Sequence, residues 1–120
     1  MGTSVKQLIH FAQLIKDKSF QQYDFGTPQK NWEVYHQETP PVINLENIQK
    51  VDVAMFAGKQ DALANPIDTR NVRDSIKTVK KYMEIDNFDH GSFLLGKDMS
   101  YLEEVVALMN QYNRKYFRNI

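Results

Sequence analysis

The sequence predicts an α/β fold, specifically the last part of a doubly wound parallel sheet. Two short apolar runs, residues 51–57 and 79–85, have the length and composition of buried strands. A segment with helical periodicity separates them, and a polar loop and a second helical segment follow. Strand, helix and strand form a βαβ unit, whose two strands run parallel, and the last helix closes it.

Composition narrows the class of protein. The chain has 120 residues, 42% of them hydrophobic, which is enough for the core of one domain or of part of one. The chain has 15 basic residues (lysine and arginine) and 15 acidic ones (aspartate and glutamate). This balance gives no sign of a basic surface, so we expect no nucleic-acid partner. The absence of cysteine excludes disulfides and zinc-thiolate sites. His10, His36 and His90 lack metal-ligand spacing, and we expect no metal or other cofactor.

We also expect neither a signal peptide nor a membrane span in this sequence. The first residues contain no apolar stretch before a small-residue cleavage site, so we expect no signal peptide. No apolar run approaches the roughly 20 residues of a membrane-spanning helix, so no transmembrane segment is expected.

The first 45 residues divide into a helix and a long connection. Ser4 and Gln7 form a capping-box pair, and the apolar spacing that follows predicts a helix ending near residues 17–19. Residues 20–45 are rich in aromatic side chains without periodicity. Several helix breakers interrupt them, so we expect an irregular connection over an apolar surface and no helix of normal length. The breakers are Gly26, Pro28, Pro40 and Pro41.

Cap signals define the helices of the second part. Asn65 is a good N-cap and Pro66 suits the first helical position, so a short amphipathic helix should follow, with Ile67, Val72 and Ile76 on its apolar face. Residues 86–91 are a polar loop. A further capping pair, Ser100 and Glu103, predicts a strongly amphipathic helix to about residue 116.

Asp61 and His90 are the candidate functional residues, because each follows a predicted strand. The carboxyl ends of parallel strands meet at one edge of the sheet, where such sheets bind ligands. An acid that orients a histidine base forms two-thirds of a nucleophilic triad. The alternatives are a turn aspartate and a surface histidine without chemistry. Asp86, Asp89 and His90 could also suggest a cation site, but three side chains on one loop are a weaker signal.

The third member of a triad is missing. None of the five serines lies in a Gly-x-Ser-x-Gly segment, the strand-to-helix turn that exposes a nucleophile. Ser92 is too close to His90 along the loop to form such a turn. We therefore expect no nucleophile within these residues.

Several blocks of the sequence nevertheless match the pattern of a known family. They are residues 2–10, residues 20–26, Tyr35-His36 with Pro40-Pro41 and Asn44-Leu45, the segment Gly58-x-x-Asp61-x-Leu-Ala-x-Pro66, and Asp89-His90 with Phe93. In these blocks the chain resembles the acid lipases, which comprise gastric, lingual and lysosomal lipases and related steryl-ester hydrolases. The resemblance covers nearly the whole chain in order. Two departures are Ala57, where the family usually has a second glycine, and Gly91 after the histidine.

The resemblance implies an α/β-hydrolase fold with an inserted cap domain and hydrolysis of triacylglycerols or steryl esters in lipid degradation. Residues 1–45 would be the end of the cap and its return segment, and residues 46–120 the C-terminal part of the core. Asp61 would be the triad acid and His90 the base. The nucleophile and the oxyanion segment lie upstream in this family, so the chain is expected to be a fragment that is inactive alone.

The family works in lysosomal or secreted settings, and its substrate is a neutral lipid ester. The resemblance also implies a partner, the missing N-terminal lipase portion. The alternative is a non-catalytic, lipase-like protein that keeps only a lipid-binding or interaction surface.

Overall fold

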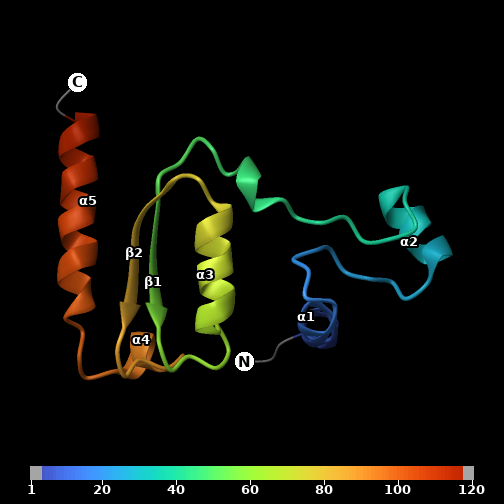
Figure 1. Cartoon of the computed structure of the whole chain (residues 1–120), viewed down its shortest axis with the longest axis horizontal. Helices are drawn as coiled ribbons and strands as arrows, with labels where there is room; N and C mark the ends of the chain where they lie inside the picture. Colours follow the sequence, from blue (N-terminus) through green and yellow to red (C-terminus); the bar gives the residue numbers. More distant parts are fainter. Residues whose placement is uncertain (1–3, 118–120) are drawn as a thin grey trace. The chain divides into compact units, whose positions relative to one another are not determined.

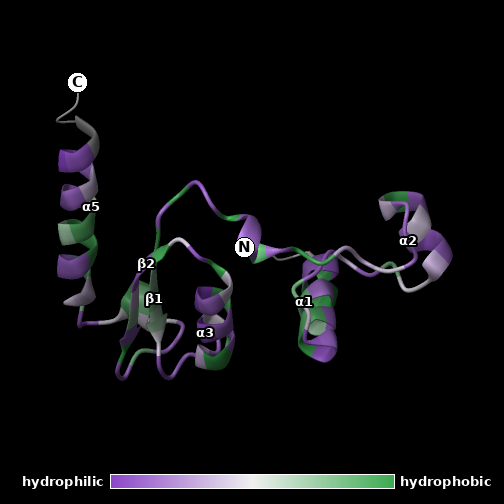
Figure 2. Ribbon diagram, turned by 45° about the horizontal axis from the view of Figure 1, so that its top comes forward, coloured by the Kyte–Doolittle hydropathy of each residue, from purple (hydrophilic) through white to green (hydrophobic). Residues whose placement is uncertain are grey.

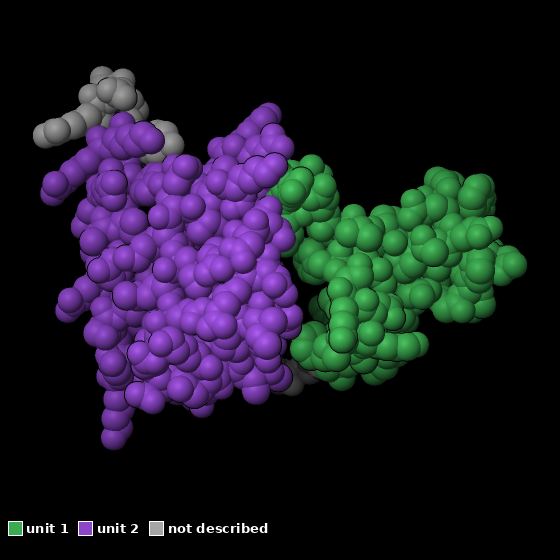
Figure 3. Space-filling view, viewed as in Figure 1, with its two compact units in different colours: residues 1–47 green, residues 48–120 purple. Residues whose placement is uncertain are grey.

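The computed structural model describes residues 4–117 and contains eight short elements (Figure 1). The chain forms two compact units, Met1–Asn47 and Ile48–Ile120 (Figure 3). The first unit contains α1 (Val5–Asp17), α2 (Pro28–Tyr35) and the 3₁₀ helix η1 (Leu45–Asn47). The second contains β1 (Val53–Gly58), α3 (Pro66–Ser75), β2 (Val79–Ile85), α4 (Ser92–Leu95) and α5 (Tyr101–Phe117).

The first unit is held together mainly by polar contacts. Gln13 on α1 donates to the backbone oxygen of Asp24 (2.8 Å) and accepts from its N–H (3.0 Å). Asn31 on α2 is 3% exposed, and its side chain bonds to the Phe25 N–H, to Asp24 Oδ1 and to the Glu38 backbone oxygen. Since a buried amide must satisfy its hydrogen bonds, Asn31 fixes the path of the chain around α2.

The structure corrects one expectation for this unit. Residues 28–35 form an α-helix, although the breakers in residues 20–45 indicated an irregular connection. Thr27 is its N-cap, with Oγ1 accepting from the Lys30 N–H at 3.3 Å, and Pro28 occupies the first turn. Proline favours that position because its missing N–H is not needed there. The first helix ends at Asp17 as expected, with Lys18 in the left-handed conformation (φ 50°).

The second unit confirms the predicted strand, helix, strand and final helix. β1 and β2 pair in parallel, with Gly58 opposite Ile85 at the carboxyl end. The second strand has the expected bounds, while the first is shifted by one or two residues from the predicted 51–57. The short helix α4 was not predicted; it occupies part of the segment between the polar loop and the last helix.

Helices lie against both faces of the sheet. Alternate β2 side chains point to opposite faces. Tyr82 and Glu84 meet α3, whereas Lys81 forms an ion pair with Glu104 of α5 at 3.0 Å. Few apolar side chains are buried between these elements. Within the described residues, the buried apolar side chains are Ala57, Ile76 and Phe88, and Ile67 of the predicted apolar face of α3 is 64% exposed.

Figure 2 shows hydrophobic and hydrophilic stretches alternating along α5. One apolar row of α5, with Val105 and Leu108, faces the sheet, and another, with Leu102 and Val106, is exposed. None of the described helices is both long enough and apolar enough to cross a membrane.

Candidate active site

Asp61 and His90 meet at the carboxyl edge of the two parallel strands. Asp61 lies three residues after the end of β1, and His90 five residues after the end of β2. His90 Nδ1 is 3.1 Å from Asp61 Oδ2, a hydrogen-bonding distance. The expected approach of the two side chains is therefore present in the structure.

The two carboxylate oxygens of Asp61 have separate partners. Oδ1 accepts from the backbone N–H groups of Leu63 (2.9 Å) and Ala64 (2.8 Å), while Oδ2 faces His90. The Asp61 side chain is only 4% exposed. One oxygen thus fixes the turn after β1, and the other remains available to the imidazole.

These contacts keep Asp61 ionised. Burial acts to raise the pKa of the carboxyl group, but hydrogen bonds from Ala64, His90 and Leu63 outweigh it, and the pKa lies below its ordinary value. A carboxylate is an acceptor only, so it selects the imidazole tautomer that carries a proton on Nδ1. Nε2 is then left with its lone pair, as a general base requires.

The His90 side chain is exposed, whereas the Asp61 side chain is buried. Its side chain is 63% accessible, and within the described part of the chain its ring makes no hydrogen bond besides that to Asp61. The loop carrying it is anchored by Phe88, which is 5% exposed and meets Phe93 and Tyr101 edge-on at ring distances of 5.3 and 5.7 Å. Asn87 takes the left-handed conformation (φ 60°), which asparagine tolerates well.

The neighbouring polar residues are engaged elsewhere. Ser92 Oγ donates to Asp89 Oδ1 at 2.7 Å and so belongs to the turn that begins α4. Asp86 pairs with Lys59 at 2.8 Å, which ties the loop after β2 to the loop after β1. Among the side chains that the structure places, no group of three or more His, Cys, Asp or Glu could hold a metal ion.

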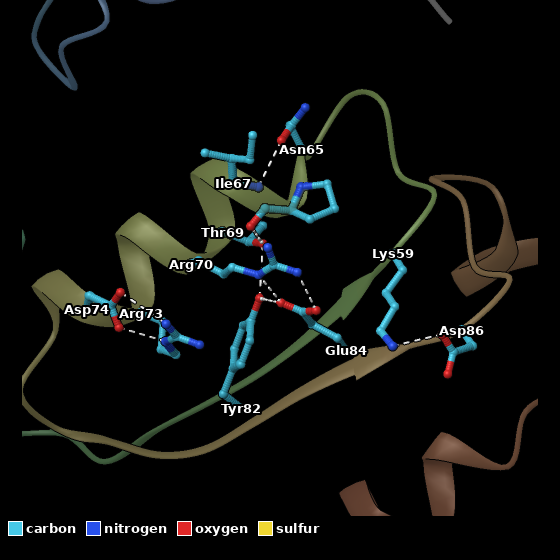
Figure 4. Close-up of polar contacts among 11 residues, drawn as sticks. Lys59, Asn65, Ile67, Thr69, Arg70, Arg73, Asp74, Tyr82, Glu84 and Asp86 are labelled. Carbon is cyan, nitrogen blue, oxygen red and sulfur yellow. Dashed lines mark hydrogen bonds and ion pairs between the residues drawn. The ribbon is translucent and has the colours of Figure 1, made fainter.

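A separate polar network joins α3 to β2 (Figure 4). Arg70 contacts Glu84 through two bonds of 2.6 and 2.7 Å, and the Tyr82 hydroxyl donates to the same carboxylate at 2.8 Å. These hydrogen bonds, from Arg70 first, lower the pKa of Glu84 to about 2. Arg73 lies over the Tyr82 ring, 4.7 Å from its centre. This network fixes the helix that links the two strands.

A groove of about 380 Å³ lies on the opposite face of the sheet, between the strands and α5. Its lining is mostly apolar and also contains three charged side chains, Asp52, Lys80 and Lys81. The lining residues are Asp52, Val53, Ala54, Phe56, Lys80, Lys81, Val105, Leu108, Met109 and Tyr112.

Two residues that support the site were not identified as functional from the sequence. Gly58 was interpreted as the end of a strand and as the first residue of a block shared with the acid lipases, and Phe88 as part of a polar loop, but neither was given a role in the site. Their importance comes from an approach between segments far apart in the chain, for which the sequence contains no direct signal.

The fold and the site together define an α/β chain with a buried carboxylate and an exposed imidazole paired at the carboxyl edge of parallel strands. Sequence comparison then identifies its relatives: the chain is related to the acid lipases over most of its length.

Lipase member K of Mus musculus is 38% identical over 97 residues, which are 81% of this chain and 24% of that protein. Gastric triacylglycerol lipase of Bos taurus is 34% identical, with 90% of this chain and 28% of the lipase covered. Lysosomal acid lipase/cholesteryl ester hydrolase of Rattus norvegicus is 33% identical, with 92% and 28% covered. The chain thus spans about a quarter of the length of these relatives. No protein-family model matches it.

Proposed function

We propose that this chain supplies the acid and the base of a serine-type hydrolase that cleaves the carboxylic esters of neutral lipids. The main support is the pair itself, in which a buried, ionised Asp61 holds Nδ1 of an exposed His90 at 3.1 Å. Similarity to proteins named as a triacylglycerol lipase and a cholesteryl ester hydrolase supports triacylglycerols and steryl esters as the substrate class.

In the proposed mechanism His90 moves one proton in each half of the reaction. Nε2 takes the first from the attacking serine hydroxyl, and the imidazolium that forms is stabilised by Asp61 through the Nδ1–H bond. His90 then gives this proton to the leaving alcohol, and the acyl-enzyme remains. In the second half His90 takes a proton from the water that attacks the acyl carbon and gives it to the leaving serine oxygen, which frees the fatty acid and restores the serine.

The serine and the oxyanion donors would come from polypeptide outside these 120 residues. In support, no serine hydrogen-bonds to His90 among residues 4–117, and the relatives are about four times as long as the matched segment. By the same resemblance we assign residues 1–45 to the end of a cap domain and residues 46–120 to the C-terminal part of an α/β-hydrolase core. An N-terminal lipase portion is then the natural partner.

A chimera tests this proposal. In mouse lipase member K, the segment that this chain matches is replaced by the corresponding residues of this chain; we call this protein the lipase K chimera. It should hydrolyse an emulsified triacylglycerol, and His90→Ala should lower the turnover by about 10⁶-fold. His36→Ala is the matched control and should leave the turnover unchanged. A folded chimera whose turnover survives His90→Ala would refute the assignment.

The second candidate is a non-catalytic lipid-binding or interaction protein, and the groove beside α5 favours it. This groove is apolar and open, and the residues that line it include neither Asp61 nor His90. Binding of a fluorescent fatty-acid ester by the 120-residue chain, lost in Leu108→Lys but kept in His90→Ala, would support this function. A folded, inactive lipase K chimera would favour it over the hydrolase.

A further inference from the structure

We propose that Gly58 is the positioning residue of the Asp61–His90 pair. Because glycine has no side chain, the Phe88 carbonyl can rest directly against the end of β1, and this contact determines where His90 meets Asp61. The inference deepens the proposed function and rests on it, since it concerns the geometry of the same acid and base.

The approach between the two segments leaves no room for a methyl group. A Cβ placed on Gly58 would lie 2.4 Å from the Phe88 carbonyl oxygen, 2.9 Å from its carbonyl carbon and 3.2 Å from its Cβ. Two of these distances are shorter than carbon atoms allow. Both residues are buried, so neither can move away into solvent. The backbone of Gly58 does not have a positive φ, so the contact itself is what demands glycine here.

Hydrogen bonds hold the two segments together on the C-terminal side of the contact. The Lys59 N–H donates to the Ile85 oxygen at 3.0 Å, and the Gln60 N–H donates to the Phe88 oxygen at 2.9 Å. The same carbonyl therefore touches Gly58 and accepts from Gln60. The ring of Phe88 fixes the loop from its other side through Phe93 and Tyr101. The Phe88 peptide is therefore held by contacts that neither segment could form alone. We call the position of the Phe88 carbonyl against Gly58 and Gln60 the Phe88 seat.

Short connections lead from this seat to both members of the pair. The Asp61 N–H donates to the Gly58 oxygen at 3.2 Å, so the acid is in a turn that starts at the glycine. His90 follows Phe88 by two residues. A methyl group at residue 58 would have to push the carbonyl oxygen out by about 1.0 Å, from 2.4 Å, to reach an ordinary contact. Carried to His90, that shift stretches the 3.1 Å bond beyond hydrogen-bonding range.

Gly91 provides a matched control in the same loop. A Cβ added there meets only Asp89 Oδ1, at 3.6 Å, which is an ordinary van der Waals contact. Gly91 also has a negative φ of −76°, so alanine fits its backbone. Gly58→Ala and Gly91→Ala thus add the same methyl group within a few residues of the pair, and only the first disturbs the Phe88 seat.

The test is the tautomer of His90 in the full 120-residue chain labelled with ¹⁵N-histidine, read from long-range ¹H–¹⁵N correlations at a pH where imidazole is neutral. A mild nonionic detergent covers the exposed apolar side chains. The parent chain and Gly91→Ala should carry the His90 proton on Nδ1, and Gly58→Ala should lose that preference. His10 is an internal reference with the opposite tautomer, because its Nε2 is 2.8 Å from the Gln21 carbonyl oxygen and must donate to it.

Retention of the Nδ1 proton in Gly58→Ala, with the parent spectrum otherwise reproduced, would overturn the positioning role and leave the pair standing. A parent chain that already lacks the Nδ1 proton would overturn the pair, and with it both proposals. If Gly58→Ala does not fold, Phe88→Leu decides, because it loosens the same seat by removing the ring anchor. A partial loss of the Nδ1 proton then supports the role, and an unchanged His90 signal contradicts it.

Discussion

Replacing Asp61 by asparagine should separate its structural contribution from its chemical one. Asparagine has the same shape, and its amide oxygen can still accept from the Leu63 and Ala64 N–H groups, now 2.9 and 2.8 Å from Oδ1. Its amide nitrogen would take the place of Oδ2, 3.1 Å from His90 Nδ1. Because an amide nitrogen only donates, it forces Nδ1 to accept and moves the imidazole proton to Nε2. The base then faces its substrate in the wrong tautomer.

The expected loss of activity is large and the loss of stability small. In the lipase K chimera, Asp61→Asn should lower the turnover by about 10⁴-fold, or about 5.5 kcal/mol of transition-state stabilisation. Asp61→Ala is the matched variant, because it also leaves the two backbone N–H groups of the turn without their acceptor. Each such buried donor costs about 1–3 kcal/mol. Asp61→Ala should therefore unfold at clearly lower denaturant concentration than Asp61→Asn.

The assay measures ester turnover and urea unfolding on the same three proteins, parent, Asp61→Asn and Asp61→Ala. Turnover of Asp61→Asn within tenfold of the parent would refute the tautomer reasoning. Equal unfolding midpoints for the two variants would refute the role assigned to Oδ1.

Other residues give further predictions. The pKa of Glu84 is about 2 in the folded chain and 4.5 ordinarily, so the contribution of its carboxylate to stability is complete above pH 4.5 and is lost as the pH falls towards 2. Glu84→Gln should therefore make the urea unfolding midpoint depend less on pH over that range. An unchanged pH dependence of the midpoint would refute this. Asn31→Ala should cost roughly 1–3 kcal/mol, seen as faster proteolysis within residues 20–40, because Asn31 satisfies buried backbone groups; proteolysis at the parent rate would contradict it. Leu102→Lys and Val106→Lys, on the exposed row of α5, should reduce binding of a hydrophobic dye while the far-ultraviolet spectrum stays the same. Dye binding equal to that of the parent would show that this row of α5 is not the apolar surface that binds the dye.

The local signals in the sequence predicted the second unit well. Asn65 is the N-cap that its position indicated, with Oδ1 accepting from the Ile67 N–H at 2.8 Å, and the apolar run at residues 79–85 is a strand with those bounds. The approach of Asp61 and His90 followed from topology, since two parallel strands bring their carboxyl ends together. Helix α2 was not predicted because Pro28 is a helix breaker in most positions; after the N-cap Thr27 it instead occupies the first turn, where proline is tolerated.

Long-range packing could not be predicted in the same way. Nothing in the sequence shows that the Phe88 carbonyl reaches Gly58, because that contact depends on how two loops cross. The division of the Asp61 oxygens between a turn and an imidazole is likewise a property of the folded chain. The exposure of Ile67 departs from the apolar face predicted for α3, whose contacts with β2 run through Thr69 and Arg70.

The most direct test of the acid–base pair is covalent labelling of the lipase K chimera with a fluorophosphonate, which reacts with a serine that a histidine base has activated. This measurement needs no lipid turnover and so does not depend on the substrate proposed. We expect the parent chimera to be labelled on one serine, His90→Ala to lose the labelling, and Gly91→Ala to keep it. Equal labelling of the parent and of a correctly folded His90→Ala chimera would show that His90 is not the base.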